Sequence, residues 1–312
     1  MEDFAVVEGA RAVAVASRSQ ERADGFAARH GLERAYGSYR EILADPDVDV
    51  LYVATPHPHH HQFALAALRA GKALLVEKAF TATTAGAAEV VDLARETGTF
   101  VMEAMWTRFQ PAVVALNELV ADGAIGEVRS VQADLGVSRE YDPVDRLFAL
   151  ELGGGALLDL GVYVVSFAQM LLGTPDRVVA TGSLFPSGAD AEAAILLGWD
   201  DGRNAALTTS LKYALPGTAR VVGTTGWIDV VPRFHHPQTI VLHRDGAEPQ
   251  EITRPQTGAG YAHELVEVGE CLRAGRTESA VMPLADTLVV QDVLGQAADR
   301  LGVRHTEAVD VL

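Results

Sequence analysis

The chain has 312 residues, enough for two domains of ordinary size, and its 48% hydrophobic and 21% charged residues make a globular composition. A net charge of −17 argues against partners that need a basic face, namely nucleic acid and anionic membrane surfaces. The single cysteine, Cys271, excludes an internal disulfide and a cysteine-based metal site. Because there is no leader pattern and no uninterrupted apolar run of about 20 residues, we expect a cytoplasmic protein.

In the first third of the chain, short apolar runs alternate with helical patterns. Buried strands are expected at 11–17, 48–55, 72–77 and 99–103. Helices are expected at 20–30, between the loop 55–59 and residue 70, and at 83–97, and residues 1–8 resemble the last turns of a helix that Gly9 caps. This alternation predicts an α/β fold with a doubly wound parallel sheet of the Rossmann type.

After Gly123, strand-like runs with turn signals dominate the pattern. They are expected at 127–137, 177–184, 191–199, 204–211, 219–223, 227–231 and 239–243. Helices are expected at 156–172, 261–274 and 283–301. The pattern predicts an α+β domain with a large, mostly antiparallel sheet. We therefore divide the chain into a dinucleotide-binding domain, 1–122, and a C-terminal substrate and oligomerisation domain, 123–312.

The dinucleotide-binding pattern is incomplete at its start. Sheets of this type begin with a strand and a glycine-rich turn whose amides hold a pyrophosphate, and no such turn follows a first strand here. In the usual strand order the first strand is central, so its loss leaves unpaired backbone groups on both neighbours. We expect that Met1 is an internal or misassigned start and that further residues lie upstream.

Ser17, Arg18 and Ser19 follow the first visible strand, at the place where NAD-specific sites carry an acidic residue for the ribose. Two hydroxyls flanking a guanidinium suit a 2′-phosphate instead, because Arg pairs with phosphate in a fork. The sequence therefore favours NADP over NAD. An ordinary surface arginine at a strand end is the alternative.

Histidines at 57 and 59–61 invite a metal interpretation. No carboxylate or cysteine supports them nearby, and the prolines of this loop are expected to hold it extended, so that the rings point in different directions. We predict no metal site. Thr55, Pro56 and His60 are expected to line the cofactor instead, with one ring turned inward.

Glu77 and Lys78 end a strand that is expected to be buried on both faces. A lysine at the carboxyl edge of a parallel sheet usually has a task in ligand chemistry, although a surface ion pair would also explain the two charges. Asp159 and Tyr163 lie four positions apart on one face of an otherwise apolar helix. We expect Tyr163 to meet Lys78 in the interdomain cleft, where the ammonium lowers the pKa of the phenol. A cap or a core hydrogen bond is the alternative for this pair.

The run 102–109 combines large aromatic side chains with charged ones after a strand end. It is compatible with a domain junction and equally with a pocket for a polyol or a cyclic diol. In the second case Glu103, Trp106, Arg108 and Phe109 would contact the substrate. Residues 139–148 are expected to shape the same pocket.

Together these motifs resemble the Gfo/Idh/MocA oxidoreductase family, and within it the branch of dimeric dihydrodiol dehydrogenases and NADP-dependent D-xylose dehydrogenases. The resemblance covers nearly the whole chain. Its markers, in order, are Ala54-Thr-Pro56 with His60, Glu77-Lys78-Ala79-Phe80, the run 103–109 and the run 153–163. It implies NADP(H), catalytic roles for Lys78 and Tyr163, Asp159 as a substrate or orienting group, and a homodimer or higher oligomer formed through the C-terminal sheet.

We therefore expect a metal-free, NADP-dependent oxidoreductase in which a sugar or cyclic diol hydroxyl loses its proton to Tyr163, assisted by Lys78. The alternative is a non-catalytic, truncated relative that binds sugars or dimerises with intact homologues. The incomplete cofactor pattern is what supports this second hypothesis.

Overall fold

A computed structural model describes residues 1–310 and 312 and contains three β-sheets. The N-terminal half carries only parallel strands, which are β1 (Ala14–Ala16), β2 (Arg34–Tyr36), β3 (Val50–Val53), β4 (Ala73–Glu77) and β5 (Val101–Ala104). The helices between them are α1 (Gln20–His30), α2 (Tyr39–Ala44), α3 (His57–Arg69) and α4 (Thr84–Thr97). The alternation of strands and helices confirms the α/β prediction for this half.

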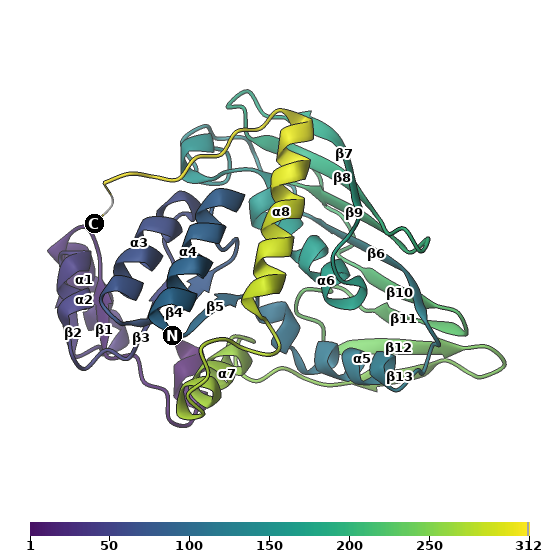
Figure 1. The fold of residues 1–312 in the computed structure, drawn as a ribbon, viewed down its shortest axis with the longest axis horizontal. Coiled ribbons are helices and arrows are strands. Elements are labelled where there is room, and N and C mark those ends of the chain that lie inside the picture. Colours follow the sequence, from purple (N-terminus) through teal and green to yellow (C-terminus); the bar gives the residue numbers. More distant parts are fainter. Residues whose placement is uncertain (311) are drawn as a thin grey trace.

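These parallel strands form two separate sheets. β1 pairs with β2, and β3 pairs with β4, which in turn pairs with β5. Among the described residues no ladder joins β1 to β3. The doubly wound sheet is therefore present in two pieces, which lie at the left of Figure 1.

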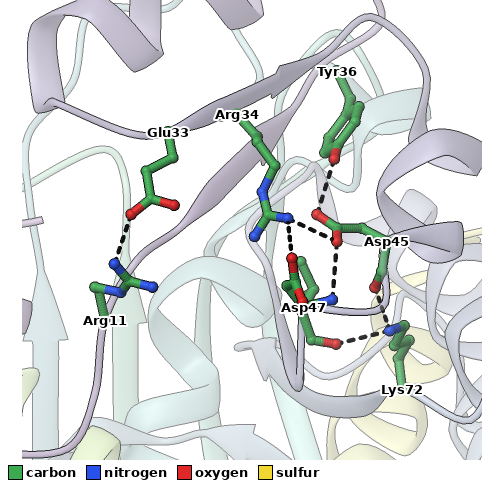
Figure 2. A network of polar contacts seen from close by, with 8 residues as sticks. Arg11, Glu33, Arg34, Tyr36, Asp45, Asp47 and Lys72 are labelled. Atoms are coloured by element: carbon green, nitrogen blue, oxygen red, sulfur yellow. Dashed lines mark hydrogen bonds and ion pairs between the residues drawn. The ribbon is translucent and has the colours of Figure 1, made fainter.

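A polar network fastens the smaller piece to the loop that precedes β3 (Figure 2). Arg34 of β2 contacts the carboxylates of Asp45 and Asp47 at 3.1 Å and 2.7 Å, and the Tyr36 hydroxyl donates to Asp45 at 2.9 Å. From the other side, the Lys72 ammonium donates to the Asp45 carbonyl at 2.6 Å. Side chains thus supply a connection between the two sheets that backbone pairing does not.

Strand β4 is buried on both faces, and its side chains divide between two cores. Leu74 and Val76 pack with the apolar faces of α3 and α4. Ala73 and Leu75 belong to the larger core that continues into the C-terminal half. Because apolar side chains pack against both faces of this strand, its carboxyl end has a fixed position. Glu77 is the last residue of the strand, and Lys78 follows it.

The C-terminal half is built on one eight-stranded sheet with the order β13-β12-β11-β10-β6-β9-β8-β7. All neighbours are antiparallel except β6 and β9, so the prediction of a mostly antiparallel sheet is confirmed. The strands are β6 (Val128–Gly136), β7 (Arg177–Leu184), β8 (Asp190–Gly198), β9 (Asn204–Ser210), β10 (Ala219–Gly223), β11 (Gly226–Val230), β12 (Thr239–Arg244) and β13 (Gln250–Thr253).

Two helices join this sheet to the N-terminal half. α6 (Val162–Leu172) packs on β6 and β9, and α8 (Leu284–Leu301) packs on α6, β7, α4 and β5. Figure 1 shows α8 running between the parallel strands and the large sheet. The helical stretch Leu150–Leu172 is long and apolar enough to cross a membrane by composition, but 83% of its apolar 18-residue window is buried here, as in the core helix of a globular fold.

The remaining helices are η1 (Glu2–Val6), η2 (Trp106–Phe109), α5 (Pro111–Ala121), η3 (Leu150–Leu152), η4 (Leu157–Gly161) and α7 (Ala262–Arg273). Six elements have no counterpart among the predicted ones, namely β2, α2, η2, α5, η3 and β13. The extended loop predicted at 55–59 is wrong, because α3 already begins at His57. Pro58 stands in its first turn, where a fixed φ and a missing N–H favour a helix start.

Candidate active site

Lys78 lies just after β4 and reaches across to the C-terminal half. Its ammonium donates to the backbone carbonyl of Asp159 at 2.8 Å, and it lies 3.3 Å from the Asp159 carboxylate. Asp159 sits in η4, the π-helical turn that opens α6. Lys78 therefore contacts the predicted helix, and its direct hydrogen-bond partner there is Asp159.

Tyr163 follows one turn later, in the first turn of α6. The Lys78 ammonium lies over its ring, 4.9 Å from the centroid, which is a cation–π arrangement. The phenol oxygen accepts a hydrogen bond of 3.0 Å from the indole N–H of Trp106. Because that N–H already occupies a lone pair of the oxygen, the phenol proton points elsewhere and can be donated to a ligand.

The charge of Lys78 is secured by its neighbours. Burial opposes the ammonium form, but Tyr163, Asp159 and Glu77 outweigh it and hold the pKa of Lys78 above its usual value. For Asp159, burial acts to raise the pKa, whereas Lys78 and Arg146 hold it below its ordinary value. The Arg146 guanidinium lies 3.5 Å from the same carboxylate. Lys78 and Asp159 are thus both charged at neutral pH.

The expectation that Lys78 lowers the pKa of the Tyr163 phenol needs correction. The Lys78 charge and the Trp106 hydrogen bond do act in that direction. Burial is the larger effect, however, and it raises the pKa of Tyr163 to about 12. Tyr163 is a neutral, proton-donating phenol at physiological pH.

Aromatic rings form a wall beside this cluster. The rings of Trp106 and Tyr261 stack at 4.4 Å with an interplanar angle of 6°, and the His236 ring stacks on Trp106 at 5.5 Å with an interplanar angle of 30°. The His235 ring lies 5.1 Å from that of Tyr163. Burial lowers the pKa of His235 to about 3, so this ring is neutral. The wall is rich in aromatic rings and stands next to the charged groups of Lys78, Asp159 and Arg146.

Two histidines of α3 connect the segments around the site through hydrogen bonds. The His60 ring nitrogens lie 2.7 Å from the Thr55 carbonyl and 3.0 Å from the Ala79 carbonyl, which ties the end of β3 to the residue after Lys78. His57 Nδ1 lies 3.0 Å from the Gly153 carbonyl. Burial lowers the pKa of His60 to about 4. These rings are structural braces, and no group of three or more metal-ligating side chains occurs among the described residues.

The predicted cofactor residues lie at the ends of three parallel strands. Arg18 follows β1 and is exposed, and the Ser19 hydroxyl accepts the Arg22 N–H as the cap of α1. Pro56 precedes α3. Glu77 accepts the backbone N–H of Lys78 at 3.2 Å, and its other oxygen bonds the Tyr52 hydroxyl. Ser17, for its part, donates its backbone N–H to Tyr36 and so belongs to the β1–β2 ladder.

These residues fit a nicotinamide dinucleotide at its two ends. The hydroxyl of Thr55 is buried without a hydrogen-bond partner among the described residues, so it is available to a ligand at the end of β3. The guanidinium of Arg18 is exposed and has no hydrogen bond or ion pair among the described residues, so it can meet a phosphate at the end of β1. Between these ends, no glycine-rich turn follows a strand in this sequence, and the pyrophosphate is assigned to no residue.

The predicted substrate residues separate into two groups. Trp106 reaches Tyr163, as described above. Glu103 and Arg108 are fully buried away from it: the Arg108 guanidinium bonds Gln169 and Asp286 at 2.6 Å each, and Glu103 accepts the Phe80 N–H at 3.1 Å. Phe109 packs in the same core. For these three residues the structure favours the domain-junction alternative.

Several residues at the site were missed by sequence reasoning. They are Tyr52, His57, His235, His236 and Tyr261. His235 and His236 stand in the loop between β11 and β12, and Tyr261 directly precedes α7, so all three come from turns with no motif of their own. Arg146 was included only as part of the segment 139–148. Only the three-dimensional fold brings these distant turns to Trp106 and Tyr163.

The fold and the charged pair define a two-domain, nucleotide-binding oxidoreductase, and comparison with known proteins agrees. One family model, described as an oxidoreductase family with an NAD-binding Rossmann fold, matches residues 4–105, and the GFO/IDH/MocA C-terminal domain matches residues 113–229. A trans-1,2-dihydrobenzene-1,2-diol dehydrogenase from Oryctolagus cuniculus is 38% identical over 299 residues, which cover 93% of this chain and 90% of that relative. The enzyme of the same name from Mus musculus is 38% identical over 301 residues, with coverages of 93% and 89%.

Solved structures give the same result. An aldose-aldose oxidoreductase from Caulobacter crescentus, complexed with glycerol, superposes with a TM-score of 0.86 at 27% identity, covering 96% of this chain and 92% of that one. KijD10, a 3-ketoreductase from Actinomadura kijaniata solved with NADP and TDP-benzene, gives 0.82 at 26% identity, with coverages of 97% and 93%. The chain belongs to the Gfo/Idh/MocA family. It is a dehydrogenase that acts on hydroxyl groups.

Proposed function

We propose that this dehydrogenase uses NADP(H) and acts on a cyclic trans-dihydrodiol or, as the second substrate class, an aldose. The observation that carries the proposal is the placement of the Lys78 ammonium over the ring of Tyr163, whose oxygen is held by the Trp106 N–H. Both groups meet at the junction of the two halves, beside the end of β4. The names of the relatives support the substrate class, and the NADP-bound KijD10 supports the cofactor.

When bound, the nicotinamide supplies hydride chemistry, and the chain's own residues manage the proton. Tyr163 is the proton donor and acceptor for the substrate oxygen. The Lys78 ammonium, which lies over the Tyr163 ring, would stabilise negative charge on that phenol or on a substrate oxygen bound next to it. Asp159 fixes the ammonium through two contacts and does not itself move a proton. The site needs no metal for this chemistry.

The aromatic wall favours the cyclic diol. The stacked rings of Trp106, Tyr261 and His236 stand next to the proton donor, and Tyr261, which is 37% exposed, offers ring surface that suits an unsaturated ring better than a sugar with hydroxyls on every carbon. A sugar would leave several hydroxyls facing this wall without partners. Arg146, more than half exposed beside Asp159, offers a donor for a second hydroxyl.

The choice of cofactor rests on Arg18. It stands exposed at the end of β1, where no acidic side chain is present to bind a ribose diol. We expect Arg18→Ala to weaken NADP binding by on the order of tenfold or more, because a charge-assisted phosphate contact is lost, while NAD binding changes little. Fluorescence titration with the two reduced cofactors measures this. Equal losses for both would contradict the assignment.

A substrate panel tests the proposed function directly. We expect trans-1,2-dihydrobenzene-1,2-diol to drive reduction of NADP, seen as the appearance of reduced nicotinamide, with a higher kcat/KM than aldoses such as D-xylose or D-glucose. NAD should support lower rates. Faster turnover of the aldoses would move the assignment to the second substrate class, and no turnover of any compound would contradict it.

One observation favours a non-catalytic function. The parallel strands fall in two sheets and no glycine-rich turn follows a strand in the sequence, so cofactor affinity lacks its usual backbone contribution. Titration of the chain with NADPH separates the alternatives. Saturable binding supports the enzyme, whereas sugar binding without NADPH binding supports a sugar-binding or dimerising protein.

We further propose a cytoplasmic homodimer or higher oligomer that associates through the large sheet. Val179 of β7 and Leu196 of β8 each expose 57% of their surface, which is unusual for apolar side chains on a packed sheet. Farther along, a groove of about 500 Å³ crosses β6, β10 and β11. Light scattering measures the mass in solution, and a strictly monomeric mass would contradict this proposal.

A further inference from the structure

Asp190, the first residue of β8, is a buried carboxyl group far from the catalytic cluster in sequence. Its side chain is fully shielded from solvent, and one oxygen accepts the backbone N–H of Leu157 at 2.6 Å. Among the described residues no cation pairs with it, and its second oxygen is buried without a partner. Burying a carboxyl group without a cation and with one unpartnered oxygen costs folding free energy, so we expect Asp190 to have a specific role.

The glycine run before α6 is shaped around this carboxyl group. Gly155 has a φ of +127°, and a Cβ at this position would collide with the unpartnered oxygen of Asp190. A side chain at position 155 is therefore excluded both by backbone conformation and by the carboxylate. The glycine and the aspartate form one unit, which the local sequence alone does not reveal.

The N–H that Asp190 accepts belongs to the first residue of η4, two residues before Asp159. A second strand holds the preceding residue, because the Thr209 hydroxyl of β9 donates to the Ala156 carbonyl at 3.4 Å. Two neighbouring strands of the large sheet, β8 and β9, thus form hydrogen bonds with the N–H and the C=O of the peptide group between Ala156 and Leu157. The carboxylate also lies at the positive end of the helix, where negative charge is favoured.

This turn carries the contacts that hold Lys78. The carbonyl and the carboxylate of Asp159 both bind the ammonium, and Tyr163 lies one turn further on. Leu157 stands in the first turn, where backbone N–H groups have no partner within the helix, so the bond to Asp190 holds an amide that the helix itself does not. A displacement at Leu157 would therefore move the Asp159 carbonyl and, with it, the Lys78 ammonium over the phenol.

We propose that Asp190 is a positioning residue for the catalytic pair: by accepting the Leu157 N–H it sets the first turn of the helix so that Asp159 holds Lys78 against Tyr163. The inference rests on the proposed roles of Lys78 and Tyr163. Burial, which raises the pKa of Asp190 to about 7, marks the carboxyl group as one that the fold keeps inside without a counter-ion. Asp190 touches no reacting atom.

The test compares Asp190→Ala with Asp190→Asn in the full chain. The alanine variant loses the acceptor, and we expect kcat for the dihydrodiol to fall by about tenfold to a hundredfold with KM changed by less than about threefold, because misplacement affects the transition state more than binding. The asparagine variant keeps a carbonyl oxygen for Leu157 and should recover kcat to within about threefold of wild type. If the alanine variant does not fold, Asp190→Ser, too short to reach Leu157, replaces it.

Glu278→Ala is the matched control. Glu278 caps the start of α8 through a carboxylate that accepts the Leu284 N–H at 2.8 Å, and it has no link to Lys78. It should lower the melting temperature as Asp190→Ala does and leave kcat unchanged. Equal kcat losses in the two alanine variants, or an asparagine variant as impaired as the alanine one, would overturn the proposal.

Amide hydrogen exchange separates this inference from the proposed function. The Leu157 N–H should exchange faster in Asp190→Ala than in the asparagine variant, whether or not the chain turns over the diol. If the wild-type chain is inactive but exchange responds as stated, the proposed function fails, whereas the positioning role of Asp190 is supported. If exchange at Leu157 is unchanged, the positioning role of Asp190 is contradicted, even in an active enzyme.

Discussion

Tyr163 shows how burial and charge compete at a single residue. The ammonium of Lys78 and the indole of Trp106 favour the phenolate, yet burial is the larger effect and raises the pKa of Tyr163 to about 12. In the direction of carbonyl reduction the phenol is therefore already protonated and ready to donate. In the direction of alcohol oxidation its deprotonated form is rare at neutral pH.

The expected consequence is an asymmetric pH dependence. The kcat for diol oxidation should rise continuously between about pH 7 and about pH 10, because the fraction of phenolate increases tenfold per unit below its pKa. Reduction of the matching ketone should change little over the same range. Steady-state kinetics in both directions measure this, and an oxidation rate that levels off near neutral pH would contradict the assignment of Tyr163 as the base.

Glu103 gives a pH prediction for stability rather than activity. Burial raises its pKa to about 7, against the opposing effects of Thr287, Arg108 and the Phe80 N–H. In the unfolded chain the carboxyl group loses its proton at about pH 4.5, so over the interval between these values only the folded state keeps the proton. The free energy of unfolding should therefore fall as pH rises through this interval.

Glu103→Gln isolates the effect, since the amide keeps the hydrogen bond from Phe80 and does not titrate. Relative to this variant, wild type should lose roughly 3 kcal/mol of stability between about pH 4.5 and about pH 7.5, the equivalent of its pKa shift. Urea unfolding at several pH values measures the difference. Parallel stability profiles for the two proteins would contradict a raised pKa at Glu103.

At the scale of elements, the pair β1–β2 depends on side chains for its attachment. Arg34 bridges to Asp45 and Asp47, and Lys72 holds the loop from the far side (Figure 2). We expect Arg34→Ala to speed amide exchange in β1 and β2 severalfold, because in the described part of the chain β1 pairs with β2 alone. Arg11→Ala removes an exposed ion pair with Glu33 and is the control. Equal exchange in both variants would contradict the role of the network.

Elements with strong periodicity were predictable, and short ones were not. Helices 20–30, 83–97 and 283–301 were placed almost residue for residue, because capping residues and glycine stops mark their ends. β2 and α2 are too short to show a period, and the sequence predicts a loop at Pro58, which instead stands in the first turn of α3. The pairing of Lys78 with the helix at 159–163 was predictable, because both carry charged groups on otherwise apolar elements. The hydrogen bond from Leu157 to Asp190 was not, because the two residues lie 33 positions apart.

At the scale of the molecule, the two halves share one core. Leu75 of β4 and Met102 of β5 belong to the same apolar cluster as α6 and the large sheet. After α8, the chain returns over the N-terminal half, where Glu307 accepts the N–H and the hydroxyl of Thr83, and Ala308 donates to the Pro58 carbonyl at 2.9 Å (Figure 1). The catalytic pair is thus assembled across an interface tied at several points, so we expect its geometry to persist without a ligand.

The boundary near residue 122 remains a prediction at this scale. It separates the parallel strands from the large sheet. The first family model ends before it, at residue 105, whereas the second begins at residue 113 and therefore includes it. α7 and α8 belong to the second part by sequence, yet α8 packs on α4 and β5 of the first. A cut at this position would expose apolar surface on both sides.

The central claim is that Lys78 and Tyr163 form the catalytic centre. Turnover of the dihydrodiol with NADP by Lys78→Ala tests it most directly, with Lys212→Ala, an exposed lysine on the large sheet, as the control. We predict that Lys78→Ala lowers kcat by about a hundredfold or more while the circular dichroism spectrum keeps its wild-type form, and that Lys212→Ala keeps full activity. The melting temperature of Lys78→Ala should fall, because the mostly buried Asp159 carboxylate loses its partner. A folded Lys78→Ala variant with a kcat within about threefold of wild type would contradict the claim.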